Sequence, residues 1–142
     1  MTSQDLRRIS PTTSWCCTSG SRAGCRLLHP RGVDRELTDG DVLDFGGGAR
    51  VVATPGHTDG SIALSLPGPR VLFTGDTMAH VEGRVILGPF NLDRAGAITS
   101  LHMLAELDVD TACFGHGDPI VGDASSALRT AASAQPRRTV KE

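Results

Sequence analysis

Between residues 37 and 74, short apolar segments alternate with turns rich in glycine and proline, and this alternation constrains the fold more than any other feature. The segment 49–54 contains β-branched valines and ends at Pro55-Gly56, which cannot continue a central strand. A turn at Gly46-Gly47-Gly48 precedes this segment and predicts a hairpin with residues 39–45. Two further strands are predicted over 61–66 and 70–74, so the chain should form a meander.

After residue 90 the apolar spacing changes from that of strands to that of helices. Asp93 is a candidate N-cap, and the apolar residues that follow it fall on one helical face. Residues 111–114 predict a last short strand, and Asp123 can cap a second helix that Pro136 would stop. Strands come first and then alternate with helices. We therefore predict a layered α/β domain, of the α+β layered kind, in which helices cover a sheet. The first helical face consists of Ala97, Ile98, Leu101, Leu104 and Ala105.

The chain divides by composition into unequal parts. Residues 1–36 are rich in Ser, Thr, Arg and Cys and have neither helical nor strand periodicity, so we expect them to be disordered or outside the fold. Residues 37–136 form the predicted domain, and 137–142 a frayed tail. Three cysteines lie in the first part, and because no second pair completes a zinc knuckle we interpret them as free thiols. These cysteines are Cys16, Cys17 and Cys25.

Charge and hydropathy exclude several classes of partner. The chain has 14 basic and 16 acidic residues, and a net charge of -2 provides no long-range attraction for nucleic acid or anionic lipid. No apolar run approaches the roughly 20 residues that span a bilayer, and no signal peptide is recognisable. Four cysteines without an even spacing fit a reducing compartment. We therefore predict a cytoplasmic protein without nucleic-acid or membrane partners.

Three residues that can bind metal ions follow predicted strands directly, each in a turn that contains glycine. His57 follows Thr54-Pro55-Gly56, Asp76 follows Phe73-Thr74-Gly75, and His116 follows Phe114-Gly115. Loops at the ends of strands on a rigid sheet commonly present functional groups. Two imidazoles and a carboxylate are ligands that Zn²⁺ accepts, with a position left for water. We predict a zinc site whose bound hydroxide attacks an ester, thioester, amide or phosphoester.

Each of these residues also has a purely structural interpretation. A single His or Asp in a turn is usually a capping or hydrogen-bonding group, and Gly-His and Gly-Asp pairs are common. Residue type and spacing alone therefore leave the metal-binding and the structural interpretations about equally supported. His80, four residues after Asp76, is interpreted as a solvated loop histidine or a residue at the mouth of the site. Asp59 and Asp118 could orient an imidazole or simply form turns.

Three motifs in the same order resemble the later motifs of the metallo-β-lactamase-fold (MBL-fold) hydrolases. They are Thr54-Pro55-Gly56-His57-Thr58 with the strand after it, Leu72-Phe73-Thr74-Gly75-Asp76-Thr77, and Phe114-Gly115-His116-Gly117. The resemblance covers about residues 37–135. It implies an αββα sandwich with the active site at one edge of its two sheets. Members of this superfamily include thioesterases, lactonases, glyoxalase II-like enzymes, nucleases and β-lactamases.

The resemblance also implies a role for each candidate ligand. His57 corresponds to the third histidine of a first metal site, and His116 to the last histidine of a second site. Asp76 corresponds to the carboxylate that bridges the two metal ions. No other residue is implied as catalytic, and the implied substrate is a small molecule.

The chain has no match to the earlier H-x-H-x-D-H motif that supplies the remaining ligands in this superfamily. We therefore expect a partial sandwich, with one sheet, helices on its outer face and weak or absent zinc binding. The expected function is a metal-dependent hydrolase impaired by the missing motif. The alternatives are a non-catalytic, truncated remnant or a subunit completed by another chain. The exposed sheet face would then favour self-association or pairing with that chain.

Residues 85–90 are apolar and are predicted to form a loop. Such a loop could contact substrate, and burial under the first helix would explain its composition equally well.

Overall fold

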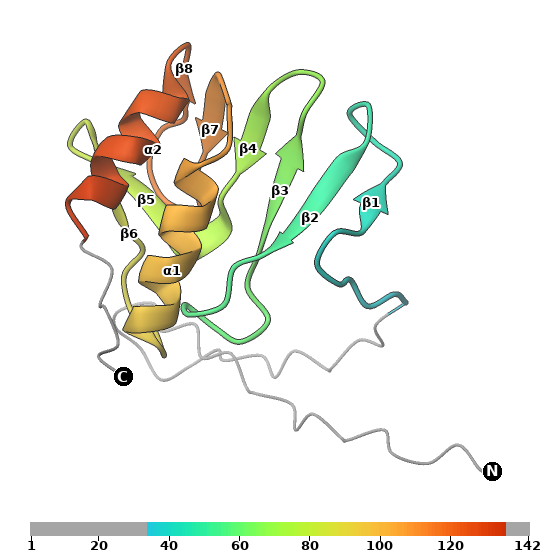
Figure 1. The fold of residues 1–142 in the computed structure, drawn as a ribbon, viewed down its shortest axis with the longest axis horizontal. Helices are drawn as coiled ribbons and strands as arrows, with labels where there is room; N and C mark the ends of the chain where they lie inside the picture. The colour runs from blue at the N-terminus through green and yellow to red at the C-terminus, as the bar shows by residue number, and fades with distance from the viewer. Residues whose placement is uncertain (1–33, 136–142) are drawn as a thin grey trace, which may run out of the picture. The chain divides into compact units, whose positions relative to one another are not determined.

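The computed structural model describes residues 34–135 (Figure 1). The chain separates into two units, Met1–Glu36 and Leu37–Glu142, and every helix and strand described below belongs to the second. The predictions for residues 1–33 and for the tail 137–142 lie outside the described residues. No helix in the described part of the chain combines the length and the hydropathy needed to cross a membrane.

Six strands form one mixed sheet in the order β1-β2-β3-β4-β7-β8. The first four are antiparallel neighbours, which confirms the predicted meander. Strand β7 then pairs with β4 in parallel, and β8 returns antiparallel to β7. Strand β8 was not predicted. The strands are β1 (Val42–Leu43), β2 (Ala49–Ala53), β3 (Ile62–Leu66), β4 (Val71–Phe73), β7 (Thr111–Cys113) and β8 (Ile120–Val121).

A separate two-stranded sheet follows the short 3₁₀ helix η1 (Gly75–Thr77). It pairs β5 (Met78–Val81) with β6 (Arg84–Leu87), and its register places Met78 opposite Leu87. The prediction of a loop over residues 85–90 is therefore wrong for residues 85–87. These residues contain a valine and an isoleucine whose strand preference is satisfied by pairing with β5. Residues 88–93, between β6 and the next helix, lack regular structure.

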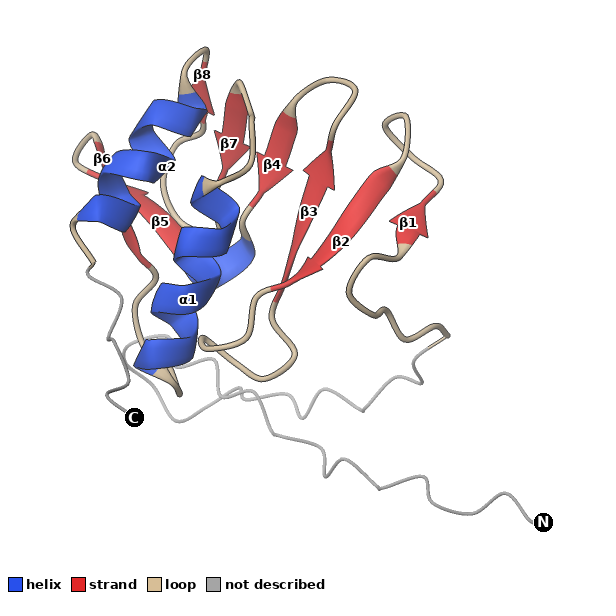
Figure 2. Ribbon diagram, viewed as in Figure 1, coloured by secondary structure: helices blue, strands red, loops and turns tan. Residues whose placement is uncertain are grey.

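Both predicted helices are present, and both begin at the predicted caps. Helix α1 (Arg94–Ala105) follows Asp93, whose carboxylate accepts a hydrogen bond from the Ala95 amide. Helix α2 (Ala124–Ser133) follows Asp123, whose carboxylate accepts from the Ser126 amide. Figure 2 shows the two helices lying side by side on the same face of the main sheet. The expected arrangement of one sheet with helices on one face is confirmed.

The hydrophobic core lies between the helices and the sheet. Side chains alternate between the two faces of a strand, so Leu72 of β4 and Ala112 of β7 point to the helix side and are fully buried. They contact a continuous cluster that includes Leu101 of α1 and Leu128 of α2. The β5–β6 sheet contributes Met78 and Leu87 to the same cluster. The main cluster of the core therefore lies on the helix side of the sheet, whereas Val51 and Leu66 are buried on the other face.

The opposite face of the sheet carries a second apolar row. The register aligns Val51, Leu64, Phe73 and Cys113 across β2, β3, β4 and β7. Phe73 lies on a central strand, yet 41% of its surface is exposed. Val51 of the same row is fully buried, so the exposed apolar surface of this row lies at Phe73, where a side chain at the centre of a sheet is normally buried.

Candidate metal-binding site

Three turns that are distant in the sequence meet at one edge of the main sheet. Strands β2 and β4 are both antiparallel to β3, and β7 is parallel to β4, so β2, β4 and β7 all run in the same direction. Their carboxyl ends consequently lie at the same edge, toward the bottom of Figure 1. His57, Asp76 and His116 follow these three ends. The meander and the parallel crossover thus bring the three candidate ligands to one place.

The Asp76 carboxylate lies between the two imidazoles. His57 Nε2 is 3.7 Å from Asp76 Oδ2, and His116 Nε2 is 3.5 Å from Asp76 Oδ1. Each imidazole therefore faces a different carboxylate oxygen. The His57 side chain is 24% exposed, that of Asp76 44% and that of His116 65%, so the group is open to solvent mainly on the His116 side.

Backbone contacts fix the turns that carry these residues. The Gly115 amide donates to the Gly75 carbonyl at 3.0 Å, which joins the turn of His116 to that of Asp76. The Ser100 hydroxyl of α1 donates to the Pro55 carbonyl at 2.8 Å, next to the turn of His57. Beneath the site, the Thr77 hydroxyl donates to the Thr54 hydroxyl at 3.0 Å, and both side chains are buried. Helix α1 and the buried threonine pair therefore fix the turns that carry His57 and Asp76.

The orientation of the His57 ring is set by a main-chain carbonyl. His57 Nδ1 lies 3.1 Å from the Pro89 carbonyl oxygen, which can only accept a hydrogen bond, so Nδ1 is the donor. The neutral ring then carries its lone pair on Nε2, the nitrogen that faces Asp76. No feature of the sequence marks Pro89 as a residue that contacts His57. A main-chain acceptor 32 residues away leaves no residue-type signal, and only the Gly88-Pro89 turn marked the position.

His80, one of the secondary candidates, contacts the residues around His116 and does not face the Asp76 carboxylate in any hydrogen bond or ion pair described. His80 Nδ1 donates to the Asp118 carbonyl at 2.8 Å, and the ring packs against Phe114 with centroids 5.7 Å apart. The His80 amide also donates to the His116 carbonyl at 2.9 Å. His80 therefore fastens β5 to the turn of His116, and Asp118 contributes its main-chain oxygen to this link.

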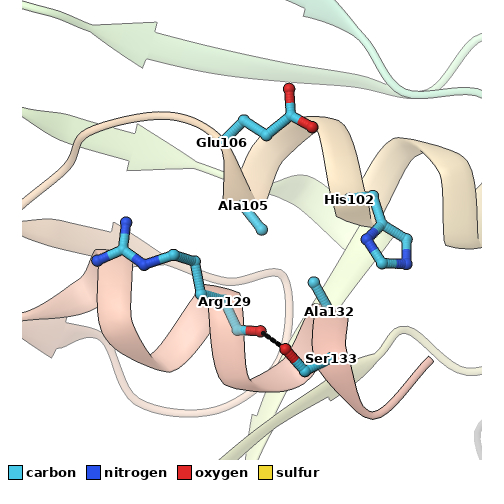
Figure 3. Close-up of a pocket in the computed structure, with 6 residues that line it drawn as sticks. All are labelled: His102, Ala105, Glu106, Arg129, Ala132 and Ser133. Atoms are coloured by element: carbon cyan, nitrogen blue, oxygen red, sulfur yellow. Dashed lines mark hydrogen bonds between the residues drawn. The ribbon is translucent and has the colours of Figure 1, made fainter. Parts of the chain in front are cut away.

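A separate open cavity of about 390 Å³ lies between α1 and α2 (Figure 3). His102, Ala105 and Glu106 of α1 line one side of it, and α2 lines the other with Arg129, Ala132 and Ser133. His102 Nε2 donates to the Gln135 carbonyl at 2.6 Å, which occupies that ring nitrogen. None of the three predicted ligands lines this cavity.

The sequence model of the metallo-beta-lactamase superfamily, a protein family, matches residues 5–116, which are most of the chain. The chain belongs to the metallo-beta-lactamase superfamily. The resemblance recognised in the three motifs is thereby confirmed. The match also includes much of the segment 1–36, although the three motifs all come from residues after it.

Curated relatives of this superfamily member are named as hydrolases. This chain is 40% identical over 107 residues to a hydroxyacylglutathione hydrolase of Brucella anthropi, and the match covers 68% of this chain and 39% of the relative. The hydroxyacylglutathione hydrolase of Brucella ovis is 41% identical over 88 residues, covering 60% of this chain and 33% of the relative. The chain therefore spans little more than a third of the length of these relatives.

Solved structures of the superfamily share the fold. A metallo-beta-lactamase family protein from Thermus thermophilus has a TM-score of 0.58 and 32% identity, covering 75% of this chain and 35% of the other. An archaeal superfamily protein from Sulfolobus tokodaii has a TM-score of 0.57 at 23% identity, covering 76% and 43%. The protein TTHA1623, solved in a di-iron-bound form, has a TM-score of 0.57 at 27% identity, covering 72% and 48%.

The described residues of this superfamily member include side chains of the types that bind metal ions, but too few of them to complete a metal centre. Two imidazoles and a carboxylate are suitable donors for zinc or iron. However, no group of three or more His, Cys, Asp or Glu side chains in residues 34–135 is arranged so that it could hold one metal ion. His57 with Asp76 Oδ2, and His116 with Asp76 Oδ1, form two pairs of candidate donor groups, here called half-sites. A tight zinc site usually has at least three protein ligands.

Proposed function

We propose that this chain supplies one half of the metal centre of a hydrolase, with His57 and His116 on separate metal ions and Asp76 shared between them. The observation that carries the proposal is the position of one carboxylate between two imidazoles, each of which faces a different oxygen. A hydrogen-bonding pair would need only one histidine. Two histidines on opposite oxygens are what a bridging carboxylate requires.

The proposed metal is zinc, and a bound ion supplies an acidified water and polarises the group under attack. The chain's own residues hold the ligands in place. The Pro89 carbonyl keeps the lone pair of His57 on Nε2, and the turn of Gly115 holds His116 against Asp76. The remaining ligands would come from outside residues 34–135.

The named relatives support a thioester as the substrate, with esters and amides as other candidates. A hydroxyacylglutathione hydrolase matches 68% of this chain, and an acylated glutathione is a thioester. Because the chain spans little more than a third of those relatives, this substrate class is a proposal for the whole active unit.

Hydrolysis of an acyl thioester tests the proposal, with release of the thiol as the readout. The chain is assayed with added zinc, with a chelator, and as the Asp76→Asn variant, which keeps the size of the side chain but removes its charge. We expect weak thiol release that depends on zinc and is lost in the variant, because residues 34–135 supply only part of the ligand set. Release that continues in the chelator, or in Asp76→Asn, would refute the metal-dependent function.

A second candidate is a subunit that becomes active only with a chain that supplies the missing ligands. The half-sites and the partly exposed Phe73 on the helix-free face favour it. Its test is analytical ultracentrifugation of the chain and of Phe73→Ser, with Val121→Ser as the control because Val121 is 78% exposed on β8 at the edge of the sheet. Association that is lost only in Phe73→Ser would show that this face is an interaction surface, as the candidate requires, and a monomer in all three samples contradicts self-association.

A further inference from the structure

The segment 88–93 between β6 and α1 holds two large apolar side chains in solvent next to a candidate ligand. Phe90 is 91% exposed and Leu92 is 79% exposed. Single apolar side chains on a surface are common, but here two lie within three residues of each other. Their neighbour Pro89 accepts the hydrogen bond from His57 Nδ1.

This segment is tied to the turn of His57 at three points. The Pro89 carbonyl accepts from His57 Nδ1 at 3.1 Å, the Leu92 amide donates to the His57 carbonyl at 3.3 Å, and the Asp93 amide donates to the Gly56 carbonyl at 2.9 Å. Figure 1 shows the corresponding proximity of the β2–β3 turn to the start of α1. Phe90 and Leu92 consequently belong to the rim of the same site as His57.

The backbone at Phe90 is unfavourable for a residue of its kind. Its φ of 58° lies in the left-handed region, which a bulky L-residue rarely adopts. The neighbouring Asn91 side chain donates to the Gly88 carbonyl, while its own buried carbonyl oxygen accepts no hydrogen bond. Contacts within the described residues do not offset these costs, because the Phe90 ring packs on almost nothing. Strain of this kind is typical of functional sites.

We infer that Phe90 and Leu92 form an apolar rim that binds a hydrocarbon group attached to the carbonyl of the substrate. The inference rests on the proposed function and specifies it: the preferred substrates would carry an aliphatic or aromatic acyl group. Transfer of each methylene from water to an apolar surface is favourable, so a longer acyl chain should bind more tightly. Because this segment is bonded to the turn of His57, an acyl chain bound to Phe90 and Leu92 would lie next to His57.

The test uses acetate and octanoate, two carboxylates that differ only in the length of the hydrocarbon chain. Their binding is measured from the amide NMR shifts of Phe90, Asn91 and Leu92, in the zinc-supplemented protein and in the presence of a chelator. The variant Phe90→Asn removes the ring, and asparagine tolerates the left-handed backbone. Phe45→Asn is the matched control, because Phe45 is 46% exposed in the turn between β1 and β2.

We expect octanoate to bind at least about tenfold more tightly than acetate in the unchanged protein and in Phe45→Asn. In Phe90→Asn the preference should fall below about threefold. Equal binding of the two acids, or a preference that survives Phe90→Asn, would overturn the inference. So would shifts at Phe90 that follow protein dilution without ligand, because they would indicate a contact between copies. Octanoate binding that zinc does not strengthen would separate the rim from His57, Asp76 and His116 and would also overturn the inference.

Zinc titration of the His57, Asp76 and His116 variants tests the proposed function independently. Equal binding of acetate and octanoate by the unchanged protein, with intact zinc binding, would refute the rim alone. Zinc binding that none of the three ligand variants weakens would refute the proposed function.

Discussion

Gly115 lies so close to the Asp76 carboxylate that a Cβ atom at residue 115 would be 1.9 Å from Asp76 Oδ1. That oxygen is the one that faces His116 Nε2. The absence of a side chain at residue 115 is therefore what allows the Asp76 carboxylate to lie against the turn of His116.

The variant Gly115→Ala should displace the Asp76 carboxylate and weaken zinc binding about tenfold or more, as loss of a supporting contact does at other metal sites. Isothermal titration calorimetry measures the effect. The control is Gly68→Ala, because a Cβ at Gly68 meets no atom within 4 Å. Equal zinc affinity in the two variants would contradict the steric role of Gly115.

Gly56→Ala should destabilise the fold by about 2–4 kcal/mol. A Cβ at Gly56 would lie 2.1 Å from the Ala97 backbone nitrogen in α1, and the φ of 133° is unfavourable for other residues. A backbone atom cannot move aside as a flexible side chain can. Urea denaturation measures the change, and a midpoint equal to that of Gly68→Ala would show that α1 does not pack against this turn.

The buried pair of Thr54 and Thr77 supports the ends of β2 and β4 beneath His57 and Asp76. Thr54→Val leaves the Thr77 hydroxyl without its acceptor and should cost about 1–3 kcal/mol. The double variant with Thr77→Val should cost less than the sum of the two single variants, because both polar groups are then removed. Additive losses in urea denaturation would mean that the two hydroxyls do not interact.

Arg70, at the start of β4, pairs with Asp108 and Asp110 in the connection between α1 and β7. The Arg70 hydrogen bonds hold the pKa of Asp108 below its ordinary value, and the partners are exposed. A carboxyl whose pKa is lower in the folded state stabilises the fold above its unfolded pKa, and this contribution is lost as the pH falls through the folded pKa.

The unchanged protein should therefore be more stable than Arg70→Ala at neutral pH, and the difference should shrink as the pH falls below about 4. It should also shrink in high salt, which screens exposed charges. Thermal unfolding across the pH range measures both trends. A difference that stays constant with pH would contradict the assigned pair, and Asp108→Asn should reproduce the loss without changing the arginine.

Much of the fold was predictable because local signals agreed with each other. Asp93 and Asp123 capped the predicted helices, and the valines of β2 and the proline and glycine turns defined the meander. Strand β8 has two residues, too few for any periodicity. The pairing of β5 with β6 depends on a turn at Glu82-Gly83, for which no prediction was made.

The candidate site was predictable as a set of residues but not as an arrangement. His57, Asp76 and His116 could be recognised because each follows a strand, and the directions of β2, β4 and β7 bring them together. The Pro89 carbonyl and the close approach of Gly115 could not be recognised, because neither depends on a chemical property of a side chain. They depend on where distant backbones meet.

Calorimetric titration of zinc into the chain and into His57→Ala, Asp76→Ala and His116→Ala tests the central claim most directly. If Asp76 binds both metal ions, as proposed, its loss should weaken binding of zinc at both, whereas loss of either histidine should weaken only one. We therefore predict the largest loss of affinity for Asp76→Ala and smaller, comparable losses for the two histidine variants. Equal weak binding in all four proteins would contradict the account.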